Sequence, residues 1–156
     1  MKLKTKHFGE IDYDSSLVIN FEEGLPGFPD NKRFIILLEN AQEDTFCWLQ
    51  SVEDGQLAFA LINIYNVKPD YNPLVNSEEV SSLGSLGDNN LLIYNVVVIP
   101  DDIRQMRANL RAPIVINPST KKGKQVILDN EEYQLKYKIF DDVEKNKTYD
   151  TMVSIQ

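Results

Sequence analysis

The sequence predicts an all-β fold: one small domain, mostly antiparallel and β-barrel-like, with a few short helices. The chain has 156 residues, which fits a single domain, and 42% of them are hydrophobic, enough for a real core. Seven Tyr, seven Phe and many Val and Ile favour strands. Short apolar runs bounded by turn residues recur along the chain, and about ten such strands must hide their edges, which favours a barrel.

We expect strands over the apolar runs that Gly, Pro, Asn, Asp or Ser residues interrupt. These runs are residues 2–5, 9–12, 17–21, 33–38, 46–51, 57–63, 91–99, 112–117, 124–128 and 133–140. In the last run Tyr133, Leu135, Tyr137 and Ile139 alternate with polar residues, so they should share one face. Because run 91–99 is almost continuously apolar, it is typical of a strand that is covered on both faces or that crosses a tight barrel core.

Turn residues indicate how these strands connect. Asp54-Gly55 separates two runs and predicts a hairpin turn, and residues 117–123 predict a longer hairpin loop. We expect residues 1–141 to form the domain. Residues 142–156 are polar and should form a frayed C-terminal tail.

Two short helical segments are expected. Ser77 can cap a helix whose first turn carries Glu78 and Glu79, because carboxylates favour the positive end of the helix dipole. Gly84 should end it. A second helical turn is expected over residues 101–106, after a proline.

Residues on the β-like runs with no polar role should form the core. We expect burial of Trp48, Phe59, Leu92, Val97, Ile114 and Val126. Cys47 lies between Phe46 and Trp48, so it is expected to be a small buried hydrophobe rather than a reactive thiol.

The net charge of −8 is unevenly distributed. Residues 1–100 carry 15 acidic and 6 basic residues, whereas residues 101–156 carry 9 and 10. An acidic chain repels phosphate, so we expect no direct nucleic-acid binding, while a basic protein partner would be attracted. Fourteen acids lie in adjacent pairs, among them Glu53-Asp54 and Glu78-Glu79. Solubility alone also explains such a solvated acidic rim.

Compartment and membrane contact follow from simple features of the chain. One cysteine permits no internal disulfide, which suits a reducing compartment. The longest apolar run, residues 96–99, is too short to span a membrane, and the basic first residues precede no apolar run. We therefore expect a cytoplasmic protein that makes no membrane contact.

The residues offer little for catalysis, metals or cofactors. His7 is the single histidine, so neither a catalytic triad nor a histidine-rich metal site can be built. Adjacent acidic residues on a strand point to opposite faces of the sheet, so they are poorly placed for general acid–base catalysis by two carboxylates. We expect no enzyme activity, no metal and no cofactor. Two alternatives stay open: an enzyme with carboxylates in a barrel mouth, and an oligosaccharide- or nucleic-acid-binding barrel with exposed aromatics on one face.

Three stretches of the sequence stand out. They are FEEGLPGF at 21–28; FCWLQS at 46–51 followed by LAF at 57–59; and NLRAPIVIN at 109–117 followed by QVIL at 125–128. Together they resemble the FliW family of flagellar assembly factors. Each has a packing explanation as well. Gly27 after Pro26 suits a type II turn, and Asn109 and Asn117 can bind backbone at the two ends of a strand. The resemblance extends to about residue 137 and is weakest over residues 65–90.

The resemblance implies a β-barrel-like fold with short helices and no enzyme activity. It also implies binding to flagellin and, alternatively, to the RNA-binding regulator CsrA. Flagellin export would then free the protein to sequester CsrA and relieve repression of flagellin translation. Candidate partner-binding residues are Glu53, Asp54, Glu78, Glu79, Asn109, Arg111 and Asn117.

Overall fold

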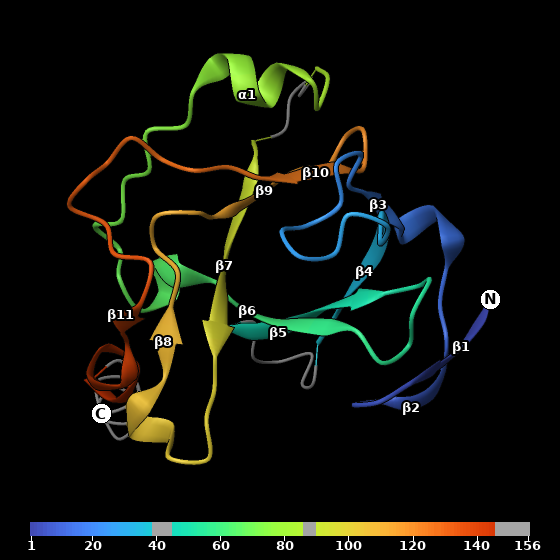
Figure 1. The fold of residues 1–156 in the computed structure, drawn as a ribbon, viewed down its shortest axis with the longest axis horizontal. Helices are drawn as coiled ribbons and strands as arrows, with labels where there is room; N and C mark the ends of the chain where they lie inside the picture. The colour runs from blue at the N-terminus through green and yellow to red at the C-terminus, as the bar shows by residue number, and fades with distance from the viewer. Residues whose placement is uncertain (39–44, 86–89, 146–156) are drawn as a thin grey trace, which may run out of the picture.

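Seven strands close into a mixed β-barrel (Figure 1). The computed structural model describes residues 1–38, 45–85 and 90–145. Around the ring the strands are β7 (Leu92–Val98), β6 (Ala58–Ile62), β5 (Phe46–Ser51), β4 (Arg33–Leu37), β3 (Ile19–Asn20), β10 (Lys122–Gln125) and β9 (Ile114–Asn117). Pairing of β7 with β9 closes the ring, and β3 with β10 is its one parallel pair among the described residues. The predicted barrel-like all-β fold is confirmed.

The remaining elements lie around this ring. A separate hairpin consists of β1 (Lys2–Thr5) and β2 (Gly9–Asp12), and the ribbon of β8 (Arg107–Ala108) and β11 (Tyr137–Lys138) continues the sheet from β7. The short helices that precede residue 140 are η1 (Ser15–Leu17), η2 (Ile64–Asn66), α1 (Ser77–Ser81) and η3 (Ile103–Gln105). η3 lies within the helical turn expected over 101–106.

Two hydrophobic cores lie on opposite sides of the barrel wall. In β9, Ile114 and Ile116 join the inner core with Phe21, while Val115 joins an outer core on the other side of the wall. Every residue of β9 is buried, so this strand is covered on both faces. Strand β7, within run 91–99, is exposed at Leu92 and Val98, so the first of its two expected arrangements is wrong, but it is a strand of the barrel. A Cβ on Gly123 would lie 2.6 Å from the Phe21 ring, so β10 can cross that ring because it has glycine there.

Three of the six residues expected in the core are buried, namely Val97, Ile114 and Val126. Cys47, which was expected to be a small buried hydrophobe, is buried as well. Trp48 and Phe59 are only half-buried, and Leu92 is 40% exposed, so burial was wrongly expected for these three.

The position of Trp48 in β5 explains why its side chain is only half-buried. Its neighbours Cys47 and Leu49 belong to the inner core, so alternation turns Trp48 outward. The β1–β2 hairpin covers it there: the His7 ring stacks on it with centroids 4.4 Å apart, and Phe8 meets it edge-on.

Several expected boundaries differ from the structure. The strand expected over 133–140 is reduced to Tyr137–Lys138, because Tyr133 lies in a turn closed by its N–H bond to Asn130 O. β10 begins at Lys122, so the loop expected over 117–123 is shorter, with Lys121 at φ +57°. The short strand β8 was not expected.

The ends of the helices also differ. The N-cap of α1 is Asn76 rather than Ser77, since Asn76 Oδ1 accepts the Glu78 N–H at 2.8 Å. Residues 140–145 are helical and Val143 is buried, so regular structure continues beyond the domain boundary expected at 141. Residues 146–156 of the expected tail lie outside the described residues.

Candidate functional site: an apolar groove beside the barrel

A proline–glycine corner forms one side of the candidate site. The Phe28 N–H donates to Leu25 O at 2.8 Å, and Gly27 follows Pro26 with φ +85°, so the expected type II turn is present. Leu25 is buried in the inner core, and the Phe28 ring packs edge-on against Phe59. The corner is therefore anchored at both ends of its turn.

Gly24 allows the corner to fold tightly on itself. Its φ is +66°, a region that costs residues with a Cβ free energy. A Cβ there would also lie 2.7 Å from the Phe28 backbone oxygen and 2.8 Å from Pro29 Cα. Few residues other than glycine could hold this loop in place.

Two adjoining hollows lie beside this corner, and we call them together the corner groove. One, of about 280 Å³, separates residues 23–29 from Lys124 and Gln125 of β10. The other, of about 220 Å³, is lined mostly by apolar residues, although polar and apolar atoms contribute about equally to its exposed surface. It is lined by Leu25, Pro26, Phe59, Val96, Asn109, Ile114 and Gln125. All three family-like stretches contribute to this second lining, although they are far apart in the sequence.

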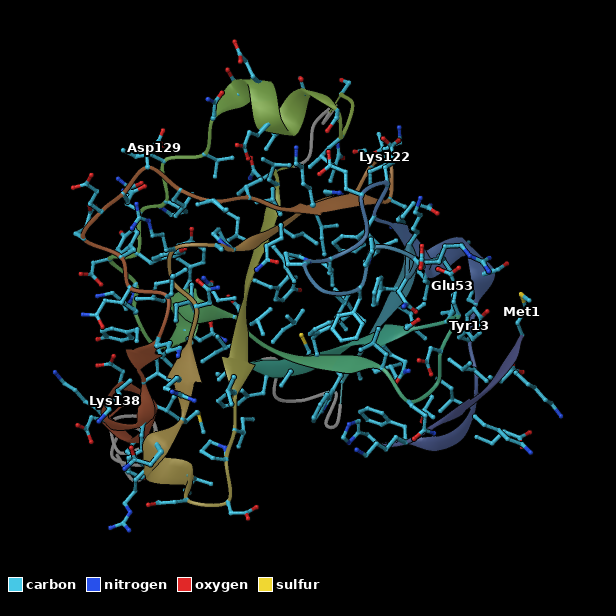
Figure 2. The ribbon with its side chains drawn as sticks, in the orientation of Figure 1. Met1, Tyr13, Glu53, Lys122, Asp129 and Lys138 are labelled. Carbon is cyan, nitrogen blue, oxygen red and sulfur yellow. The ribbon has the colours of Figure 1, made fainter. Side chains whose placement is uncertain are left out.

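Charges beside the groove are paired. Lys122 Nζ lies 3.3 Å from Glu22 Oε1, and Lys124 Nζ lies 3.8 Å from Glu23 Oε1. These partly exposed pairs contribute little to stability. They do offset the charges of Lys122 and Lys124 at this end of the barrel, where Figure 2 labels Lys122.

The expected acidic contacts lie apart from each other. Glu53 and Asp54 are in the β5–β6 turn, at the right in Figure 2, whereas Glu78 and Glu79 are on α1, at the top in Figure 1. Glu53 Oε1 accepts the N–H of Lys32 at 2.7 Å and of the next residue at 2.9 Å, so it holds the start of β4. The structure does not bring the two pairs together.

The three candidates of the third stretch have structural contacts. Asn109 Oδ1 accepts the N–H of Arg111 at 3.2 Å and of Ala112 at 2.9 Å, and Arg111 Nε donates to Leu128 O at 3.4 Å. Asn117 is fully buried. The expectation that Asn109 and Asn117 bind backbone at the ends of this strand is confirmed, and Asn117 is not available to a partner.

Asn117 joins the barrel to the segment that follows α1. Its Nδ2 donates to the carbonyl oxygens of Leu83, Gly84 and Ser85 at 3.0 to 3.2 Å. Its Oδ1 accepts the N–H of Ser119 at 2.9 Å and of Thr120 at 3.3 Å. One buried amide thus organises two loops.

Within the described residues, two further kinds of site can be assessed. No group of three or more His, Cys, Asp or Glu side chains there is placed to hold a metal ion. Phe28 and Tyr65 are the exposed aromatic residues in this part of the chain, and they come from the corner and from η2. They do not form the aromatic face expected of an oligosaccharide-binding barrel. In the same part of the chain, no helix has the length and apolar character needed to cross a membrane.

Sequence reasoning missed the groove itself. Phe59, Val96 and Gln125 were not named as candidates, although Phe59 and Gln125 lie in the family-like stretches. The sequence offered one indication of the groove: the three stretches contain apolar residues, and the first of them also contains the proline–glycine corner. Only closure of the barrel brings the three stretches together, and no local pattern encodes that closure.

The fold and the groove define a small β-barrel whose distinctive surface is an apolar groove at a proline–glycine corner. Over residues 2–139 the sequence matches the family described as FliW protein. Flagellar assembly factor FliW of Thermoanaerobacter pseudethanolicus is 45% identical over 143 residues, covering 92% of this chain and 95% of the relative. Flagellar assembly factor FliW of Alkaliphilus metalliredigens is 43% identical over 145 residues, covering 93% and 90%.

A solved structure agrees with these relatives. The crystal structure of the flagellar assembly factor FliW matches with a TM-score of 0.82 and 34% identity, covering 90% of this chain and 97% of that one. The chain belongs to the FliW family of flagellar assembly factors. The family is non-enzymatic, so the expectation of no enzyme activity is confirmed and the carboxylate enzyme is set aside.

Proposed function

We propose that this protein binds flagellin and, alternatively, the RNA-binding regulator CsrA, and that it acts in the cytoplasm. Flagellin export would free it to sequester CsrA and so relieve repression of flagellin translation. The observation that carries the proposal is the meeting of all three family-like stretches around one apolar groove. Family membership supports a flagellar role.

The groove suits flagellin better than it suits a nucleic acid. Half-buried Phe59 and Val96 line it together with the buried Leu25 and Ile114, and the lysines beside it are paired with acids. Apolar side chains of a partner segment would gain free energy by leaving water there. Binding of flagellin should therefore depend little on salt.

The net negative charge of this chain suits binding to CsrA, because an RNA-binding regulator is basic. Residues 1–100 hold the excess of acids, and on α1 Glu78 is exposed and Glu79 is half-buried. Long-range attraction by exposed charges accelerates encounter and is screened by salt. Bound acidic surface beside an RNA site would also repel phosphate, so inhibition needs no RNA contact by this protein.

Stopped-flow association with each purified partner, at several salt concentrations, tests the proposal. We expect salt to slow association with CsrA more than it speeds dissociation, and to change flagellin association little. The double change Glu78→Lys and Glu79→Lys should slow CsrA capture. We choose this pair because Glu53 holds the start of β4, so reversing its charge would disturb the barrel.

The matched control neutralises Lys121 and Lys122 with glutamine, which removes charge of the other sign. Acidic steering predicts no slowing of CsrA association in this control. If only the lysine change slows association, or if association does not respond to salt, acidic steering is refuted. Absence of binding to both partners refutes the proposed function as a whole.

A further inference from the structure

Strand β10 is paired over its full length along one edge only. On one side it pairs with β9 over its full length, from Lys122 to Gln125. On the other side a single rung joins Lys122 to Asn20 of β3. Beyond Asn20 the pairing with β4 continues for one residue, since the Phe21 N–H donates to Lys32 O at 2.7 Å. The chain then turns, because the Gly24 N–H donates to Phe21 O at 2.9 Å.

The backbone groups on this second edge can be assigned from the register. The N–H of Val126 donates to Pro113 O at 3.0 Å and that of Leu128 to Arg111 O at 2.8 Å, so the ladder beside β9 continues past β10. Backbone groups alternate between the two edges of a strand. The N–H and C=O groups of Gln125 and Ile127 therefore point away from β9, and no described residue bonds to their N–H groups.

This open edge adjoins the corner groove. The 280 Å³ hollow separates it from residues 23–29. Gln125 also lines the apolar hollow, and Ile127, which is 72% exposed, shares its face of the strand by alternation. An added strand here would find backbone partners on its inner edge and apolar surface for alternate side chains.

We propose that an extended segment of flagellin adds as a strand to the β10 edge at residues 125–127. The chemistry of the edge fixes the conformation of the occupant, because unpaired N–H and C=O groups in a row are satisfied by another extended backbone and not by a helix. The proposed binding of flagellin supplies its identity. The apolar groove then selects a segment with apolar residues at alternate positions. This inference rests on the proposed binding of flagellin and specifies how that binding occurs.

The test is the Ile127→Pro variant, with Ile127→Ala as its matched control. Proline removes the edge donor at residue 127 but leaves the ladder to β9, and an extended edge position tolerates it. Alanine keeps the N–H and removes most of the side chain. We expect Ile127→Pro to weaken flagellin binding at least ten-fold in isothermal titration calorimetry, and Ile127→Ala to weaken it less.

Amide hydrogen exchange of the wild-type protein gives a second readout that needs no variant. The N–H groups of Gln125 and Ile127 should exchange more slowly in the flagellin complex than in the free protein. If flagellin binds while these two amides stay unprotected and Ile127→Pro binds normally, strand addition is refuted and the proposed function stands. If the wild-type protein does not bind flagellin, both are refuted. Should Ile127→Pro fail to fold, the exchange result alone decides.

Discussion

Replacing Asn117 with alanine should destabilise the barrel without touching a partner surface. The side chain is fully buried, and the hydrogen bonds of its amide are all made with backbone groups of two loops. Alanine would leave those groups unsatisfied or exposed to entering water. The expected effect is therefore on the free energy of unfolding and not on binding by the folded protein.

The magnitude follows from the individual contacts. A buried group that loses its hydrogen-bond partner costs about 1–3 kcal/mol. The loss is smaller than a simple sum because Thr120 Oγ1 still donates to Leu83 O at 2.6 Å. We expect Asn117→Ala to cost roughly 2–4 kcal/mol, which lowers the melting temperature of a domain of this size by roughly 5–15 °C.

Urea unfolding followed by circular dichroism measures this loss, and Asn117→Asp is the informative comparison. Aspartate keeps the acceptor for Ser119 and Thr120 but directs a carboxylate at three carbonyl oxygens, so it should be more harmful than alanine. The reasoning is refuted if alanine leaves the midpoint unchanged, or if aspartate is the milder substitution. Weakened partner binding by the folded alanine variant would restore Asn117 as a contact.

Three further predictions concern the corner, the outer face and an alkaline transition. Gly24→Ala should lower the urea midpoint clearly more than Gly27→Ala, because a Cβ meets backbone at Gly24 and nothing within 4 Å at Gly27; equal losses would contradict this. His7→Ala should raise acrylamide quenching of Trp48 fluorescence, since the His7 ring covers the indole; unchanged quenching would show that the hairpin does not cover it. Burial raises the pKa of Tyr71 to about 12, so stability should be full below pH 10 and fall as the pH rises toward 12. Ultraviolet titration of tyrosinate should show a late group, near pH 12, that is missing in Tyr71→Phe.

Local patterns were sufficient for the class of fold but not for its closure. The runs rich in Val, Ile, Phe and Tyr predicted strands, and the need to hide their edges predicted a barrel. The parallel pairing of β3 with β10 joins Asn20 to Lys122, and no neighbouring residues encode it. Trp48 was misplaced because apolar neighbours do not reveal which strand face the barrel interior occupies.

For the candidate site too, local features could be predicted from the sequence, whereas contacts between distant segments could not. Pro26 and Gly27 predicted their turn correctly, since a type II turn is a local property. The acidic pairs were chosen by composition, and the fold spreads them over separate elements. The groove depends on contacts between Leu25, Phe59 and Ile114, which only ring closure brings together.

Titration of flagellin into a preformed complex of this protein with CsrA tests the central claim most directly. Size-exclusion chromatography with light scattering separates the free regulator, the two binary complexes and any ternary complex. Alternative binding predicts that CsrA elutes free in proportion to the flagellin added, with no species containing all three proteins. A stable ternary complex, or CsrA that stays bound at saturating flagellin, would contradict it.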